Sequence, residues 1–253
     1  MSLNSKAWKR ISLGAVTLVS AAVLTACGGG SSTTSSSKDE INWYLPTEIS
    51  TLDISKVTDS YSSIAIGNSG SNLLRRDKNG DLQPDLAAKD IEVSDDGLTY
   101  TATLRDNLKW SDGSDLTAED FVYTWQRIVD PKTASEYAYL VSDAHVLNAE
   151  EVINGTKSVD ELGVKADGNK VIFTLSSPSP QFMSLLSFTN FMPQSKAFVE
   201  KTGDDYGTSS DKALYSGPYT VKDWNGTNGT FTLVKNNYYW DAKDVKNEKV
   251  NIQ

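Results

Sequence analysis

Few side chains in this sequence could carry acid–base or covalent chemistry. The 253 residues include one histidine, His145, and one cysteine, Cys27. A serine hydrolase triad would have to use His145, and no Gly-x-Ser-x-Gly turn is present to expose a nucleophilic serine. No glycine-rich loop ends in Lys-Ser or Lys-Thr, which argues against nucleotide hydrolysis. Paired acids at 95–96 and 150–151 are typical of solvated turns and helix starts rather than of a glycosidase. We therefore predict a protein that is not an enzyme, without catalytic residues, bound metal or cofactor.

Cys27 stands at the end of a segment that is typical of an export signal. Residues 1–10 carry three basic and no acidic side chains, and residues 11–26 are uncharged. That run is shorter than the roughly 20 residues of a membrane-spanning helix. The order Leu-Thr-Ala-Cys at 24–27 resembles the lipobox of bacterial lipoproteins, whose thiol accepts a diacylglyceryl group. We predict a signal peptide over 1–26 and lipid attachment at Cys27, against the alternatives of a core helix and a stray free thiol.

The next residues predict a tether between the membrane and a folded body. Residues 27–38 are rich in Gly, Ser and Thr and offer no apolar side chain after Cys27 for a core. Two or more acyl chains hold a protein stably on a bilayer. The net charge of −9, from 33 acidic and 24 basic residues, disfavours binding to nucleic acid or to anionic lipid surfaces. We therefore expect a protein on the extracytoplasmic face of the cell membrane, held there by its lipid anchor.

The body is predicted to alternate between β-hairpins and helices. Asp-Gly turns at 96–97 and 167–168 separate runs in which apolar and polar residues alternate, which is typical of antiparallel hairpins. Residues 217–240 predict a third hairpin. Further helices are expected at 62–74, 149–154, 181–188 and 195–203, and further strands at 41–45 and 249–253. This mixture predicts the α+β class.

The clearest predicted helix lies between Thr117, a capping residue, and Pro131. Phe121, Trp125 and Ile128 recur within it at helical spacing. Because such a stripe usually faces a core, we interpret these three side chains as core residues rather than ligand contacts.

Residues 99–140 carry a longer pattern that points to a family. They contain Leu-Arg, then Lys-Trp-Ser-Asp-Gly, then Thr-Ala-Glu-Asp-Phe-Val-Tyr-Thr-Trp. In this order and spacing the segment resembles the oligopeptide-binding proteins of bacterial ABC importers, extracellular solute-binding protein family 5, in which serine stands at the place of Thr124. The resemblance runs from about residue 41 to the last residue. Within the motif we interpret Trp110 and Asp120 as scaffold residues.

The resemblance implies a fold and a binding mode. Family members have a two-lobed, periplasmic-binding-protein-like fold of type II, and the lobes close over an extended peptide held like an added strand. By position, Thr58, Asp59 and Ser60 are expected in the strand that pairs with the peptide, and Tyr137 matches a pocket tyrosine. The implied partners are an oligopeptide and an ABC permease and ATPase complex, for a monomer in a Gram-positive bacterium.

The chain has about half the length expected for the family. Residues 39–253 would form the first lobe with its inserted subdomain, and the second lobe would be largely missing. We expect such a lobe to bind peptides weakly, because it cannot enclose them. The alternatives are a surface lipoprotein of another class, such as an adhesin or a cell-wall hydrolase, and a truncated fragment deficient in binding.

Overall fold

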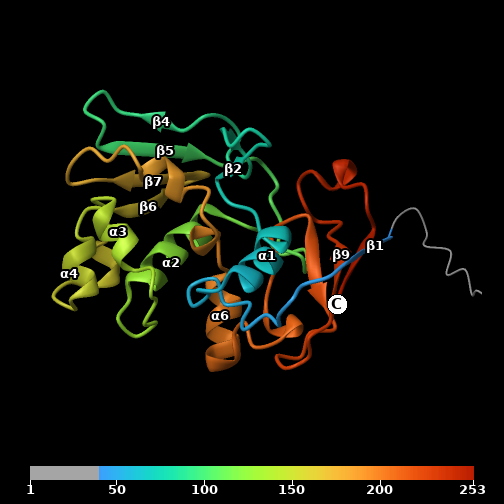
Figure 1. Cartoon of the computed structure of the whole chain (residues 1–253). Coiled ribbons are helices and arrows are strands. Elements are labelled where there is room, and N and C mark those ends of the chain that lie inside the picture. The colour runs from blue at the N-terminus through green and yellow to red at the C-terminus, as the bar shows by residue number, and fades with distance from the viewer. Residues whose placement is uncertain (1–39) are drawn as a thin grey trace, which may run out of the picture. The chain divides into compact units, whose positions relative to one another are not determined.

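The computed structural model describes residues 40–253 and contains two four-stranded sheets and one two-stranded sheet (Figure 1). Each four-stranded sheet has its own hydrophobic core. Among these residues, no helix is both long and apolar enough to span a bilayer. The predicted signal peptide, Cys27 and the tether lie outside the described residues.

The first sheet has the strand order β1-β10-β9-β8. Its strands are β1 (Glu40–Trp43), β8 (Tyr219–Lys222), β9 (Phe231–Lys235) and β10 (Lys249–Ile252). β1 pairs with β10 in parallel, and the other pairs are antiparallel. Val221, Leu233 and Val250 are buried on the face that packs with helix α1 (Ser60–Ser69). The predicted hairpin over 217–240 is therefore confirmed.

The second sheet is antiparallel and has the order β4-β5-β7-β6. Its strands are β4 (Glu92–Val93), β5 (Thr99–Thr103), β6 (Val164–Asp167) and β7 (Lys170–Thr174). Gly97 and Gly168 adopt positive φ angles of 70° and 58° in the two turns, a conformation that glycine tolerates without strain. Both predicted Asp-Gly hairpins are confirmed.

Helix α2 (Ala118–Val129) covers the second sheet and contacts β6 and β7 (Figure 1). Phe121, Trp125 and Ile128 are fully buried, as their spacing predicts. The Asp120 carboxylate accepts hydrogen bonds from the Thr117 N–H at 2.8 Å and from Trp110 Nε1 at 3.3 Å. The start of α2 is thus fixed by the scaffold residues of the sequence motif.

The predicted helix at 62–74 is wrong in its bounds. α1 covers Ser60–Ser69, and residues Leu74–Arg76 form strand β2, which pairs with β3 (Leu82–Pro84). The chain turns at Gly70, where a Cβ atom would lie 2.5 Å from Met192 Sδ. The Leu74 N–H then donates to the Leu186 carbonyl, so tertiary contacts end this helix early.

Short elements complete the described part of the chain. The α-helices are α3 (Tyr139–Asp143), α4 (Ala149–Ile153), α5 (Phe182–Leu185) and α6 (Lys196–Thr202). The 3₁₀ turns are η1 (Val159–Glu161), η2 (Thr189–Phe191), η3 (Gly203–Asp205), η4 (Ser210–Lys212) and η5 (Ala242–Asp244).

Candidate functional site

The segment expected to pair with a peptide is a turn followed by a helix cap, so the predicted strand at Thr58, Asp59 and Ser60 is wrong. Asp59 is the N-cap of α1, and its Oδ1 accepts the Ser62 N–H at 2.7 Å. Ser50 Oγ donates to Asp59 Oδ2 at 2.6 Å. Burial acts to raise the pKa of Asp59, but the hydrogen bonds from Ser50 and Ser62 outweigh burial and hold the pKa below its ordinary value. The capping carboxylate is the physical reason for a helix start here.

The main chain of this segment nevertheless offers free polar groups. Thr58 is exposed, and within residues 40–253 neither its N–H nor its C=O has a hydrogen-bond partner in the protein. Ser60 is the first residue of α1, where the N–H has no partner inside the helix. These groups can pair with the main chain of an extended ligand without a regular strand. The role of Thr58, Asp59 and Ser60 in peptide contact remains a prediction.

A buried ion pair fixes the start of the segment. Arg127, on α2, donates to both carboxylate oxygens of Asp53, at 2.6 and 2.7 Å. The Asp53 side chain is 2% exposed and that of Arg127 is 12% exposed. Arg127 also donates to Gln194 Oε1 at 3.1 Å, and Gln194 Nε2 donates to Ser55 Oγ at 2.9 Å. The buried pair is therefore linked through Gln194 to Ser55, two residues after Asp53.

A second buried side chain, Asn190 in the turn η2, bonds to the main chain of residues 54–57. Its Nδ2 donates to the carbonyls of Ile54 at 2.8 Å and of Val57 at 3.0 Å. Asn190 is 2% exposed. Because these two carbonyls precede Thr58, the bonds fix the backbone that leads into Thr58.

Tyr137 lies against the same turn. Its ring is half-buried and meets the ring of Phe188 edge-on, with the ring centroids 5.6 Å apart. Phe188 caps η2 and is 38% exposed. The structure thus brings Tyr137 and the Thr58 segment to a common support, the turn around Asn190. The role of Tyr137 as a pocket residue remains a prediction.

Sequence reasoning missed Arg127, Asn190 and Phe188. Arg127 lies between Trp125 and Ile128, two core residues of the predicted helix, and a charged residue so close to a buried stripe was a usable signal. Phe188 is the last residue of the helix predicted at 181–188 and Asn190 lies just after it, and no local pattern marks either residue.

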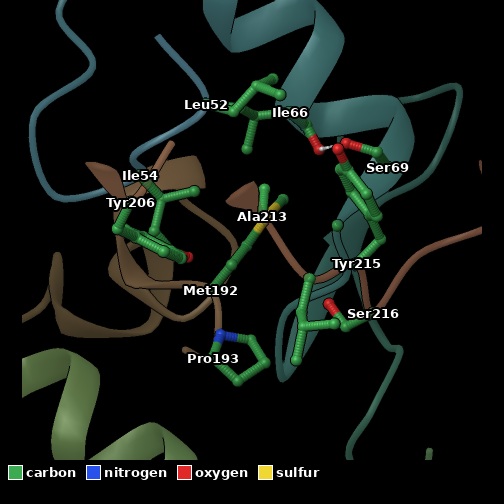
Figure 2. A pocket seen from close by; sticks show the side chains of 12 residues that line it. Leu52, Ile54, Ile66, Ser69, Met192, Pro193, Tyr206, Ala213, Tyr215 and Ser216 are labelled. Carbon is green, nitrogen blue, oxygen red and sulfur yellow. Dashed lines mark hydrogen bonds between the residues drawn. The ribbon is translucent and has the colours of Figure 1, made fainter. Parts of the chain in front are cut away.

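A small cavity lies behind the segment. Figure 2 shows Leu52, Ile54 and Met192 among its lining side chains, together with Tyr215. Its volume of about 20 Å³ is room for roughly one water molecule. It cannot hold a peptide, so we assign it to packing rather than to the binding site.

His145 lies in an open hollow formed with Tyr139, Asp143, Glu150 and Gln181. Its φ angle is 59°, a left-handed conformation. Within the part of the chain that the structure describes, no group of three or more His, Cys, Asp or Glu side chains is placed to hold a metal ion.

Comparison with known proteins decides the family. Residues 81–253 match the model of bacterial extracellular solute-binding proteins, family 5. The chain belongs to this family. The resemblance identified from residues 99–140 is therefore confirmed.

Peptide-binding relatives align with nearly the whole chain. A dipeptide-binding protein of Lactococcus lactis is 45% identical over 97% of this chain and 44% of its own length. The oligopeptide-binding protein OppA of Bacillus subtilis is 34% identical over 96% of this chain and 46% of its own. The chain thus spans somewhat less than half the length of these relatives.

A solved family 5 structure shows the same partial coverage. Listeria monocytogenes OppA, bound to peptide, superimposes with a TM-score of 0.83 and 37% identity, over 86% of this chain and 43% of that one. The described residues therefore have part of the two-lobed fold of these substrate-binding proteins, and the predicted fold class is confirmed.

Proposed function

We propose that this chain is the peptide-contacting part of a membrane-anchored receptor that captures extracellular oligopeptides for an ABC importer. The observation that carries the proposal is the exposed Thr58 main chain together with the Ser60 N–H. Within residues 40–253 these groups have no hydrogen-bond partner, and the residues before them are held by buried polar side chains. Relatives of the family bind dipeptides or oligopeptides, which supports the same class of ligand here.

Main-chain pairing explains how such a site would accept many sequences. Every peptide presents the same N–H and C=O groups, so bonds to Thr58 and Ser60 carry no side-chain preference. Each bond contributes on the order of 1 kcal/mol net. Tyr137 and Phe188 offer an aromatic surface beside the segment, where an apolar peptide side chain would be selected.

The anchor completes the proposed receptor. Lipid on Cys27 and the flexible residues 27–38 would hold the body close to the membrane, where the permease and ATPase of an importer lie. The acidic composition fits an exported protein, and the basic head of residues 1–10 supports export. The Gram-positive origin and the monomeric state belong to the same proposal.

The chain's length bears on affinity. Because the chain spans less than half the length of its relatives, we expect the residues present here to enclose a peptide only in part. We expect peptide dissociation constants in the range of roughly 1 mM for this chain alone, since only a few net hydrogen bonds would form.

Binding without turnover tests the proposal against its alternatives. Short peptides of mixed sequence are titrated into residues 39–253 by calorimetry, and their integrity is followed by mass spectrometry. We expect weak, saturable binding of intact peptides. Cleaved peptides would indicate a cell-wall hydrolase, and the absence of binding at several mM would indicate an adhesin or a binding-deficient fragment.

A further inference from the structure

Arg127 connects the two hydrophobic cores of the described chain. Its helix neighbours Trp125 and Ile128 belong to the core of the sheet β4-β5-β7-β6. Asp53 is flanked by Leu52 and Ile54, which belong to the core of the sheet β1-β10-β9-β8. The ion pair therefore ties a helix of one core to the segment that enters the other.

Stability alone does not account for this pair. Removing two charges from water is costly, and well-packed apolar residues in place of a buried ion pair are often equally stabilising. What an apolar pair cannot provide is orientation. The guanidinium meets the carboxylate as a two-pronged fork, at 2.6 and 2.7 Å, which allows one mutual geometry.

The orientation of Asp53 determines the turn that follows it. Its Oδ1 accepts the Ser55 N–H at 3.0 Å. Its main-chain carbonyl accepts the N–H groups of Lys56 and Val57, both at 3.0 Å. These three bonds fix the conformation of residues 53–57, the residues that directly precede Thr58.

The surroundings of Arg127 leave it little freedom to move. Gln194 accepts a third hydrogen bond from Arg127, and the Tyr206 ring lies 5.3 Å from the Arg127 Cζ atom. Gly207 passes so close that a Cβ atom there would lie 2.2 Å from the Asp53 N atom. The pair is thus enclosed on both sides.

We propose that Arg127 is a positioning residue for peptide binding, which acts through Asp53 to hold the main chain of residues 54–60 in its peptide-accepting conformation. It touches no ligand itself. The ligand in this inference rests on the proposed function, whereas the fixed conformation belongs to the peptide-free protein.

The test compares residues 39–253 as wild type with the variants Arg127→Met, Arg127→Met/Asp53→Leu and Arg105→Met. The single variant leaves Asp53 buried without a partner and can fail to fold, so the double variant keeps the test decisive. Arg105 is the matched control, because it is half-buried and stacks on Trp240, with its Cζ 3.7 Å from the ring centroid. Two quantities are measured: hydrogen exchange of the Val57 amide, and amide shifts on titration with Ala-Ala-Ala.

We expect the double variant to fold, with a urea midpoint below the wild-type value because the buried Ser55 N–H loses its acceptor. Its Val57 amide should exchange roughly tenfold faster, because the turn is no longer fixed, while amides of β5 and β7 stay protected. The apparent affinity for Ala-Ala-Ala, measured from the amide shifts at Thr58, should fall roughly tenfold. Arg105→Met should change neither quantity.

Unchanged Val57 exchange and unchanged Ala-Ala-Ala affinity in the double variant would overturn the inference. The proposed function has a separate outcome. A wild-type protein without peptide shifts at Thr58 would overturn that function, whereas faster Val57 exchange in the double variant would still uphold the positioning of the segment by the Arg127–Asp53 pair.

Discussion

At the scale of single residues, the Asp120 carboxylate joins two other residues of the sequence motif. It accepts hydrogen bonds from Thr117 and Trp110, and it is 9% exposed. Burial raises its pKa from 3.8 to about 6, although the bonds from Thr117 and Trp110 act to lower it. The folded protein therefore binds a proton at Asp120 more tightly than the unfolded chain does. The resulting stabilisation is fully present below about pH 4 and is lost as the pH rises through 6.

This shift predicts a pH-dependent difference between wild type and Asp120→Asn. The amide keeps an acceptor oxygen for Thr117 and Trp110 but does not ionise. We expect the wild-type free energy of unfolding to fall relative to the variant between about pH 4 and pH 7, by on the order of 3 kcal/mol. Urea titrations across this range measure the difference. Asp112→Asn, at an exposed position in the preceding turn, is the control, and parallel curves for Asp120→Asn and wild type would disprove the assigned shift.

Cys27 supplies a second prediction at this scale. Cys27→Ser removes the thiol that a diacylglyceryl group requires, so the protein should remain unprocessed or be released from the membrane. Detergent partitioning and the mass of the mature protein measure this. A serine variant that still enters the detergent phase as a processed protein would contradict the lipobox interpretation.

At the scale of elements, the sequence predicted the helices and hairpins that local residue patterns determine. Asp-Gly turns and alternation placed the hairpins, and helical spacing placed α2. It failed at Thr58 and Ser60, where the capping side chain of Asp59 starts a helix in place of the expected strand. The contact between Arg127 and Asp53 spans 74 positions, a separation that no periodicity can reveal.

The helix start at Ser60 makes a clean test of main-chain recognition possible. Proline is favoured at the first helical position, and Asp59, with φ −97° and ψ 151°, has the conformation that a residue before proline adopts. Ser60→Pro should therefore change stability by less than about 0.5 kcal/mol while removing one N–H donor.

We expect Ser60→Pro to weaken peptide binding about five- to tenfold, the loss of roughly one net hydrogen bond. Ser60→Ala is the matched control, since it removes the hydroxyl and keeps the N–H. Equal affinities of Ser60→Pro and Ser60→Ala, measured by titration with peptides of equal length and varied sequence, would show that the Ser60 N–H does not contact the ligand.

At the scale of the whole described chain, β1 forms an exposed edge of its sheet. Ile41 is 43% exposed and Trp43 is 41% exposed, and the following Tyr44 is 71% exposed. An unpaired, apolar strand edge favours association with other chains. Away from this edge, the apolar residues of each sheet gather in a buried core of their own. This arrangement fits the match to part of a family 5 fold.

We therefore expect residues 39–253 to self-associate at high concentration. Trp43→Lys should raise the concentration needed for association about tenfold, because a charge at an edge strand opposes pairing. Sedimentation velocity over a concentration series measures this. Tyr238→Lys is the control, since Tyr238 is 52% exposed and lies outside the edge strand. A control variant as disruptive as Trp43→Lys would show that association does not use β1.

The most direct test of the central claim is a map of amide shifts in ¹⁵N-labelled residues 39–253 during titration with Ala-Ala-Ala. The account predicts saturable shifts at Thr58, Asp59 and Ser60, with smaller shifts at Tyr137. The same map with Ala-Ala-Ala methylated at both peptide nitrogens, which removes its amide N–H donors, should show weaker binding at the same amides. Shifts confined to the hollow around His145, with Thr58 to Ser60 unmoved, would contradict the account.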